Sequence, residues 1–433
     1  MDAAVREFVV VGSGAGGASV ALELAKRGRQ VTVLERGATP TGFGTFAHAA
    51  RFYDAAPLIT LPRRSREGVI LWRALTRGGS TVVACGNLNR SLGAELAAHG
   101  LDLDDDLTTA EGEFGVAPWP LDRLSPGGRL LMQAAEDAGT PLRPMPKAIN
   151  LDLCSGCGLC VLGCATGAKW TAAGMLDQAV GLGAEVVTGM EVTDVIVRAG
   201  RAAGVRGRGS GGPFELGAGS VILAAGGLAT PILLQRAGVR EAGGGLFADL
   251  FVNVYGRLSG DGFAADQTTE PVMSLVHLDS RERCGFILSP FVNQPRRVRF
   301  LEAGVRGFAL PRTRTLGVMV KTTDDGAGRV PAAGRISKPV TSGDRRRLDE
   351  GAAAARRILE AAGVSPRSVL VSGVQGAHPG GTAGIGRVVD EGLRTGIPGL
   401  FVCDASVLPS APGLPPILTI VALARRLART LAG

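Results

Sequence analysis

The sequence predicts an α/β fold of more than one domain, with a parallel-sheet unit and a second, mixed-sheet unit. At 433 residues the chain is longer than a typical single domain. Hydrophobic residues make up 45% of it and charged residues 20%, so it can bury a large core and is not disordered. The chain also starts with an apolar run, a glycine-rich loop and a helical pattern, which is how a parallel α/β unit begins.

The formal net charge of +8 invites a nucleic-acid interpretation. The arginines are scattered, however, and their densest groups lie at 63–66, 296–299 and 345–347. We interpret these groups as solvated faces, with a positive surface for an acidic partner protein as the alternative. Aromatic residues, at 4%, are too few for base-stacking platforms, so we expect no nucleic-acid partner.

Two features bear on where the protein works. The longest apolar stretches, 220–234 and 415–427, are short and interrupted by glycine, proline or arginine, so we expect no membrane span. The first residues lack the pattern of a secretion signal. Four of the seven cysteines lie between 154 and 164, which does not resemble a secreted disulfide framework. We therefore expect a reduced, cytoplasmic setting.

The first expected strand covers residues 7–12, a β-branched run that ends in glycine. The loop 12–17 (GSGAGG), a helix over 18–27 and a second strand over 31–34 follow, and Glu35 ends that strand. This is the G-x-G-x-x-G pattern in a strand–turn–helix context, with an acidic residue about twenty positions further on. It predicts a dinucleotide-binding unit but does not distinguish NAD from FAD. A tight turn without a ligand is the alternative.

Each residue of this pattern has a physical role in binding a dinucleotide. Gly12 permits the tight turn, Gly14 lets the backbone approach a pyrophosphate, and Gly17 lets the helix pack on the strand. The N-terminus of the helix presents N–H groups to the phosphates. Glu35, with Arg36 beside it, can accept hydrogen bonds from an adenosine ribose.

Later segments extend the same unit. Gly79 and Ser80 begin a loop of small residues that reaches Asn87, where the backbone can lie against a flat ring. Strands are expected within 186–195 and over 220–227, and the second of these ends in glycine.

These segments, with His378-Pro379-x-Gly-Thr382 and Asp404-Ala-Ser-x-x-Pro409 ahead of a final helix, resemble the glucose–methanol–choline (GMC) oxidoreductases. The family consists of FAD enzymes, so the resemblance implies FAD as the cofactor. It is specific at both ends of the chain and loose in the middle.

The resemblance also implies roles for particular residues. Asp404 would bind the ribitol or pyrophosphate region, and the backbone of Val192 would contact the adenine. The final helix, which opens at Pro416, would direct its positive end toward the pyrimidine side of the flavin. The implied FAD-binding residues are Gly12, Gly14, Gly17, Glu35, Arg36, Gly79, Ser80, Asn87, Val192, Ala225, Gly226, Asp404, Ala405, Pro416 and Ile417.

Oxidation of an alcohol by hydride transfer needs a base for the hydroxyl proton. In the family's His-Pro-x-Gly-Thr context, His378 would be that catalytic base. His48, His99 and His277 have no comparable setting, and we expect them to be ordinary structural residues.

The family's second catalytic residue, a His or Asn, would stand at Pro415. Proline has no side-chain donor or acceptor, so another residue must supply this role or the chemistry differs. The asparagines that could do so are Asn87, Asn89, Asn253 and Asn293.

Four cysteines have the spacing Cys154-x-x-Cys157-x-x-Cys160-x-x-x-Cys164. This is the spacing of the bacterial ferredoxin run, so we predict a [4Fe–4S] cluster that passes electrons one at a time. All four cysteines could bind it, or three of them with Cys85, Cys284 or Cys403 as the fourth ligand. Zinc usually takes two C-x-x-C units separated by a longer loop. A structural zinc site and thiols without metal are the alternatives.

We expect a discontinuous, Rossmann-like FAD-binding domain from 1–95, 165–245 and 371–433. A connecting segment, 96–164, carries the cysteine loop, and 246–370 forms a mixed-sheet substrate-binding domain. Within the latter, strands are expected over 272–278, 286–291 and 315–321, and one helix over 344–362.

The leading functional prediction is an FAD-dependent dehydrogenase of the GMC type. It would oxidise a CH–OH group of a small alcohol or of a polyol or sterol-like substrate, and electrons would leave through the cluster to an external acceptor such as an acidic carrier protein. One alternative is a flavin alcohol oxidase that reduces O₂ and whose cysteines are structural. Another is an electron-transfer flavoprotein subunit without substrate chemistry.

Overall fold

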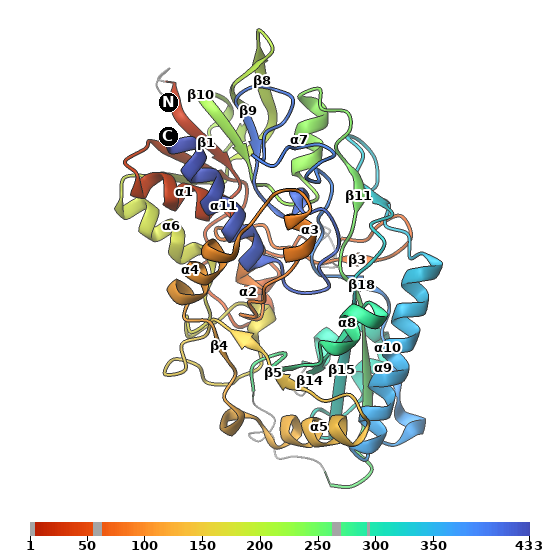
Figure 1. Ribbon diagram of the computed structural model, residues 1–433. Coiled ribbons are helices and arrows are strands. Elements are labelled where there is room, and N and C mark those ends of the chain that lie inside the picture. The colour runs from red at the N-terminus through yellow and green to blue at the C-terminus, as the bar shows by residue number, and fades with distance from the viewer. Residues whose placement is uncertain (1–4, 55–62, 262–269, 292–294) are drawn as a thin grey trace.

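The computed structural model describes residues 5–54, 63–261, 270–291 and 295–433. A seven-stranded sheet lies in the upper half of Figure 1 and a six-stranded sheet in the lower half. Both ends of the chain lie beside the seven-stranded sheet. Over the described residues, the helices are too short or too polar to cross a membrane.

The seven-stranded sheet is built around the first predicted strand. β1 (Arg6–Val11) lies between β2 (Val31–Glu35) and β10 (Gly212–Leu223) and runs parallel to both. β7 (Glu185–Thr188) pairs with β2, and β19 (Leu400–Val402) pairs with β10. These pairings are all parallel, as expected for strands whose apolar residues are buried on both faces.

The long strand β10 belongs to two arrangements. Its second half lies parallel to β1, whereas its first half pairs antiparallel with β9 (Arg201–Gly209). β9 in turn pairs with β8 (Glu191–Arg198), which forms the hairpin at the top of Figure 1. A turn at Gly189, whose φ is 73°, separates β7 from β8.

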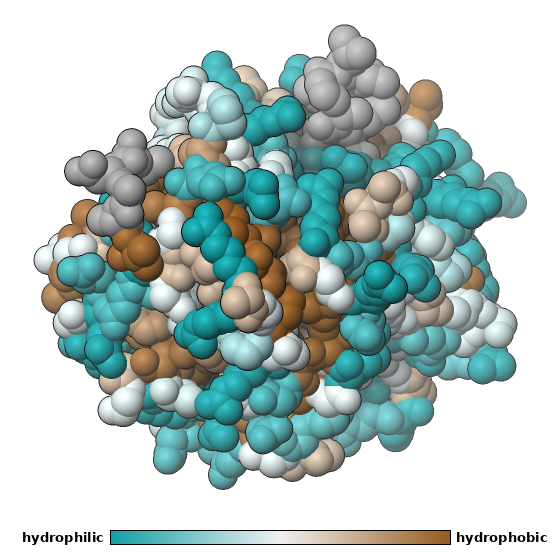
Figure 2. Space-filling model, turned by 90° about the horizontal axis from the view of Figure 1, so that it is seen from above, coloured by the Kyte–Doolittle hydropathy of each residue, from teal (hydrophilic) through white to brown (hydrophobic). Residues whose placement is uncertain are grey.

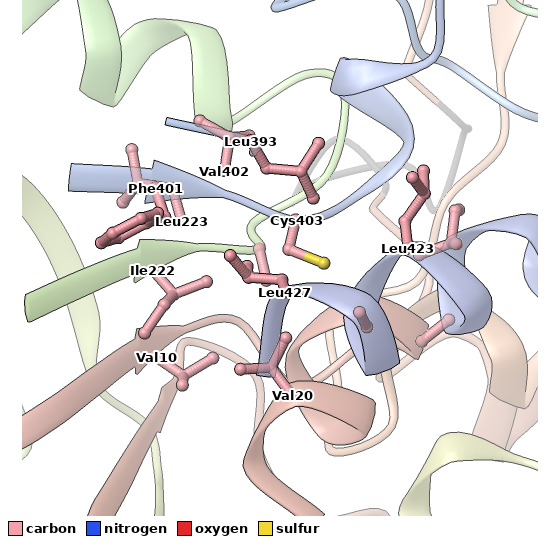
Figure 3. Close-up of a cluster of buried hydrophobic side chains, with 14 of the residues drawn as sticks. Val10, Val20, Ile222, Leu223, Leu393, Phe401, Val402, Cys403, Leu423 and Leu427 are labelled. Carbon is pink, nitrogen blue, oxygen red and sulfur yellow. The ribbon is translucent and has the colours of Figure 1, made fainter. Parts of the chain in front are cut away.

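Three helices cover this sheet. α1 (Ala15–Lys26) packs against α6 (Ala172–Gly181) and α11 (Ile417–Ala432). Figure 3 shows part of the core of this unit, where side chains from β1, α1, β10, β19 and α11 meet. Burial of one such Val or Leu side chain stabilises the fold by about 1.5–3 kcal/mol. The labelled residues are Val10, Val20, Ile222, Leu223, Leu393, Phe401, Val402, Cys403, Leu423 and Leu427.

In the six-stranded sheet, β15 (Thr315–Thr322) lies between β14 (Phe286–Phe291) and β12 (Leu250–Arg257), antiparallel to both. β18 (Gln375–Gly376) and β3 (Ile70–Leu71) continue the sheet beyond β12. A short strand, β17 (Leu370–Val371), also pairs with β12. The strands predicted over 286–291 and 315–321 are therefore present.

One face of this sheet packs on α10 (Ser342–Ala361), which confirms the helix predicted over 344–362. Side chains alternate along a strand, so Val318 and Val320 of β15 point toward α10. Met319 and Lys321 point the other way, toward the interior between the two sheets.

The expected strand over 272–278 is wrong. Only β13 (Leu275–Val276) forms there, because Met273 has a φ of 57°, in the left-handed region, which interrupts an extended chain. β3 and β18 also lie in the six-stranded sheet, although 1–95 and 371–433 were assigned to FAD binding. The division into domains at those residues stays a prediction.

Candidate active site

A cavity of about 920 Å³ is lined by residues of both sheets. Val11 and Glu35 come from the seven-stranded sheet, and Phe251 and Met319 come from the six-stranded one. Figure 2 shows a hollow lined with apolar residues and framed by hydrophilic ones on the face seen from above. Every residue predicted to bind FAD lines the cavity except Gly17, and so does His378.

The glycine-rich loop has the shape that its pattern predicts. Gly12 has a φ of 104°, and a Cβ atom there would lie 2.3 Å from the carbonyl oxygen of Ala224. A Cβ atom on Gly17 would lie 2.0 Å from the carbonyl oxygen of Gly12, so Gly17 serves helix packing rather than the cavity surface. Gly14, at the N-terminus of α1, has no atom within 4 Å of its Cβ position, so space is open to a ligand there.

Glu35 holds the loop together as well as lining the cavity. Its Oε2 accepts hydrogen bonds from the Ser13 amide at 3.0 Å and the Ser13 hydroxyl at 2.6 Å, and its Oε1 accepts one from the Gly37 amide at 2.7 Å. Burial raises the pKa of Glu35. The Ser13 hydroxyl also accepts a hydrogen bond from the Gly78 amide at 3.1 Å, which joins the loop to Gly79.

Asp404 has a similar positioning role. Its Oδ2 accepts hydrogen bonds from the Gly226 amide at 2.8 Å and the Thr230 hydroxyl at 2.5 Å, and its Oδ1 accepts one from the Ser406 amide at 2.7 Å. These bonds tie β19 to the turn that follows β10. This turn is why the strand expected over 220–227 ends at Leu223.

The N-terminus of α11 faces the cavity through Pro415, Pro416 and Ile417. A buried hydroxyl pair, Ser91 and Thr419 at 2.9 Å, fixes the first turns of this helix to the chain beyond Asn87. The positive end of a 16-residue helix therefore adjoins the cavity.

His378 forms a pair with Asp249 at the wall of the cavity. The Nδ1 atom of His378 lies 2.8 Å from Oδ2 of Asp249, whose other oxygen accepts a hydrogen bond from the Gly413 amide at 2.9 Å. Burial, and next the charge of Lys321, hold the pKa of His378 well below its usual value. His378 is therefore neutral at neutral pH. With Asp249 as acceptor, the proton is on Nδ1 and Nε2 carries the lone pair.

Asp249 and Lys321 were not among the site residues predicted from the sequence. Asp249 is fully buried and follows an apolar run that resembles ordinary core. A signal was available for Lys321, because a single lysine ends the alternating strand TLGVMVK. Neither residue falls in a motif.

The four asparagines proposed to replace the missing His or Asn differ in whether they line the cavity. Asn87 and Asn253 line the cavity, Asn89 does not, and Asn293 lies outside the described residues. The Asn87 side-chain oxygen accepts a hydrogen bond from buried Lys147. The other three histidines do not line the cavity, as expected. His277, for example, is held by the carbonyl of Pro141 and the hydroxyl of Ser280.

Cys154, Cys157, Cys160 and Cys164 lie around one small cavity. Burial raises the pKa of the Cys164 thiol, but hydrogen bonds from the Thr166 hydroxyl and from nearby amides outweigh it and lower this pKa. Over the described residues, no group of three or more His, Cys, Asp or Glu side chains could hold a metal ion. The structure therefore gives no support to the predicted metal site.

Sequence comparison connects this site to known proteins. Two family models with the description GMC oxidoreductase match the chain, the N-terminal one over residues 7–250 and the C-terminal one over 327–424. An uncharacterized GMC-type oxidoreductase from Mycobacterium tuberculosis is 32% identical, over 96% of this chain and 74% of its own length. A long-chain-alcohol oxidase from Arabidopsis thaliana is 26% identical, over 96% of this chain and 65% of its own length.

Solved structures share the fold. The chain is similar to pyridoxine 4-oxidase from Mesorbium loti, with a TM-score of 0.74 and 19% identity over 98% of this chain and 99% of that one. It is also similar to formate oxidase from Aspergillus oryzae, with a TM-score of 0.75 and 18% identity over 100% of this chain and 98% of that one. The predicted α/β class, with a Rossmann-like FAD-binding unit and a mixed-sheet unit, is confirmed. The chain belongs to the GMC oxidoreductase family.

Proposed function

We propose that the protein is an FAD-dependent oxidoreductase that removes a hydride from a CH–OH group, with His378 as the base. The observation that carries this proposal is the His378–Asp249 pair in the wall of the large cavity. When bound, FAD supplies the acceptor for the hydride. Family membership supports both the cofactor and the reaction class.

The residues present fit an FAD molecule. The space at Gly14 leaves room for the pyrophosphate at the N-terminus of α1. Glu35 and Val192 lie on the same cavity and are suited to the ribose and the adenine. Asp404 and the N-terminus of α11 lie on this cavity as well.

The protein itself contributes a proton acceptor, the Nε2 atom of His378, for the hydroxyl group of the substrate. Asp249 accepts the Nδ1 proton of His378 and so leaves Nε2 as the acceptor for a substrate hydroxyl proton. The burial of His378 keeps its imidazole neutral and able to accept that proton. When the hydroxyl proton moves to Nε2, the hydride leaves carbon and a carbonyl product forms.

The walls around His378 favour an alcohol with an apolar carbon skeleton over a polyol. Phe251, Met273, Phe291 and Met319 line the cavity and pack into one cluster, and Ala377, the residue before His378, packs against that cluster. A polyol would leave several hydroxyl groups without partners against such a wall, which is costly. A small primary or secondary alcohol is therefore the proposed substrate class.

The proposal also covers the route by which electrons leave the protein after the substrate is oxidised. We propose that the cysteines hold a [4Fe–4S] cluster that serves an external one-electron acceptor. Their ferredoxin-like spacing supports this. Cys160 lines the small cavity, and the next residues, Val161 and Leu162, line the large one, so one short 3₁₀ turn adjoins both. Direct reduction of O₂, with structural cysteines, is the second candidate, because the solved neighbours are oxidases.

Replacement of His378 tests the main proposal. His378→Ala should slow flavin reduction by an alcohol about 10²–10⁴-fold, the usual range for loss of a general base. Bleaching of the flavin in single-turnover experiments measures this rate, with a panel of primary and secondary alcohols as substrates. FAD content should not change, because the pyrophosphate and ribose contacts proposed at Gly14 and Glu35 do not involve the His378 side chain. Bleaching at the wild-type rate in His378→Ala would refute the role of His378.

Metal analysis tests the electron route. Anaerobically purified protein should contain iron and sulfide in equal amounts, and Cys157→Ser should lose both and slow turnover with one-electron acceptors. Replacement of Cys284, which is exposed and outside the cluster, is the matched control and should keep the iron. Protein without iron that consumes O₂ and forms peroxide would favour the oxidase instead.

A further inference from the structure

Lys321 is a charged residue buried in the mainly apolar strand β15. β15 is buried along its whole length, and Lys321 is 2% exposed. Its neighbours across the sheet are Phe251 on β12 and Ile287 on β14. The alternation of β15 directs Lys321, like Met319, into the large cavity.

The other buried lysines have partners. Lys147 donates hydrogen bonds to the carbonyl oxygens of Cys85 at 3.1 Å and Val272 at 2.9 Å. Lys169 likewise donates to backbone carbonyls, at 2.8 Å and 3.1 Å for two of them. Lys338 forms an ion pair with Asp324 at 2.8 Å.

Lys321 differs from these three. Within the described part of the chain, its amine has no hydrogen bond and no ion pair, although it interacts electrostatically with Asp249, Cys85 and His378. A buried ammonium without a hydrogen-bonded partner is costly to keep. The chain has five lysines among its 47 basic residues, so arginine is its usual cation. These facts indicate that Lys321 is kept for a ligand that enters the cavity.

The site also lacks a hydrogen-bond donor where the family resemblance places one. Pro415 lines the cavity but cannot donate. Asn253 also lines it, but one N–H of its amide is directed to Glu302 at 3.0 Å, and its oxygen, which has no partner, can only accept. Asn87 has a buried amide nitrogen without a partner, but the oxygen of this side chain is held by Lys147, away from the His378–Asp249 hydrogen bond. Lys321 is the cavity donor that interacts with both members of the His378–Asp249 pair.

We propose that Lys321 is a second catalytic residue, whose ammonium group donates a hydrogen bond to the substrate oxygen beside His378. This inference rests on the proposed function. As the O–H bond breaks, the proton goes to Nε2 of His378 and the negative charge that develops on oxygen is stabilised by Lys321, which keeps its own proton. The electron pair of the C–H bond leaves as hydride to the flavin, so the products are a carbonyl compound and a reduced flavin. The nearby carboxylate of Asp249 balances the charge of the ammonium.

A binding experiment tests the role of Lys321 without turnover. Acetate and octanoate place a carboxylate where the substrate oxygen would lie, and their binding to the FAD-loaded protein can be followed by titration calorimetry and by the visible spectrum of the flavin. Lys321→Met should weaken octanoate binding roughly 10- to 100-fold, as expected for loss of a charged hydrogen bond. Lys321→Arg keeps the charge and should bind octanoate more tightly than Lys321→Met does. Lys26→Met removes an exposed lysine and is the control, which should bind as the wild type does.

Two further measurements separate the possible outcomes. Lys321→Met should keep its FAD, because the proposed pyrophosphate and ribose contacts at Gly14 and Glu35 do not involve Lys321. If an alcohol substrate is found, Lys321→Met should reduce its flavin more slowly by about 10²–10³-fold. Octanoate binding that does not depend on Lys321, or that is absent in the wild type, would overturn the inference. Failure of every alcohol to bleach the flavin, with Lys321-dependent octanoate binding intact, would instead count against the proposed oxidation and leave an anion-binding role for Lys321.

Discussion

Asp249 adopts a backbone conformation, with a φ of 48°, that few residues other than glycine adopt. Strained residues of this kind persist where the surrounding structure fixes them, and they cluster at functional sites. Here the carboxylate is held by the Gly413 amide and by His378. The carbonyl of the preceding residue, Ala248, accepts a hydrogen bond from the His378 amide at 3.0 Å. The strained position thus aims one carboxylate oxygen at the imidazole.

The residue-scale prediction is a pH dependence that belongs to Asp249 rather than to His378. Burial raises the pKa of Asp249 to about 7, although Lys321 and the Gly413 amide lower it. Above that pH the carboxylate accepts the Nδ1 proton, and below it the protonated group cannot. The rate of flavin reduction should therefore fall as the pH drops through about 7.

Asp249→Asn tests this assignment. The variant cannot ionise, so above a pH of about 7 its flavin-reduction rate should be about 10²–10⁴-fold below that of the wild type, and it should lose the step near neutral pH. Stopped-flow bleaching between acid and mildly alkaline pH measures both effects, and FAD content checks that the variant is folded. A step that persists in Asp249→Asn would show that a different group titrates.

At the scale of one element, α10 shows how a local sequence signal sets a boundary. The Thr341 hydroxyl accepts a hydrogen bond from the Asp344 amide at 3.0 Å, and the Asp344 side chain accepts one from the Thr341 amide at 3.0 Å. This reciprocal capping box starts the helix that supports the six-stranded sheet from behind the cavity.

Loss of this cap should destabilise the protein without harming the site. Thr341→Ala should lower the free energy of unfolding by about 1 kcal/mol, the typical cost of losing such an N-cap. Urea unfolding followed by circular dichroism measures the change. Ser342→Ala, at the exposed next position, is the control and should change little. FAD content should be equal in the two variants. A Thr341→Ala protein as stable as the control would show that the cap contributes nothing.

At the scale of the whole molecule, the large cavity is the place where the two sheets meet. Its walls come from segments at both ends of the chain and from the middle. A ligand that fills this cavity contacts both sheets at once and binds only the folded state. Stability should therefore depend strongly on cofactor occupancy.

Cofactor removal is the test at this scale. Free FAD at about 100 times its dissociation constant should stabilise the protein by about 2.7 kcal/mol relative to protein stripped of cofactor. Thermal unfolding at increasing FAD concentration measures this shift, and NAD at the same concentrations is the control. A shift with NAD but not with FAD would contradict the cofactor assignment.

The sequence by itself determined the parts of this protein that depend on neighbouring residues. The β1–loop–α1 unit was predictable because the steric needs of Gly12 and Gly17 arise within one turn and one helix. The helix over 344–362 and the strand over 286–291 were predictable for the same reason, since periodicity records local burial. His378 was found through a motif of adjacent residues.

Only the tertiary structure decided what surrounds His378. Asp249 is 129 positions away from His378. Lys321 lies on β15, whereas Asp249 precedes β12 and His378 follows β18 of the same sheet. No local pattern records that these side chains face one cavity, because their proximity depends on how the strands of the sheet are ordered. The strand predicted over 272–278 was wrong because Met273 adopts a left-handed backbone conformation that its apolar sequence context does not predict.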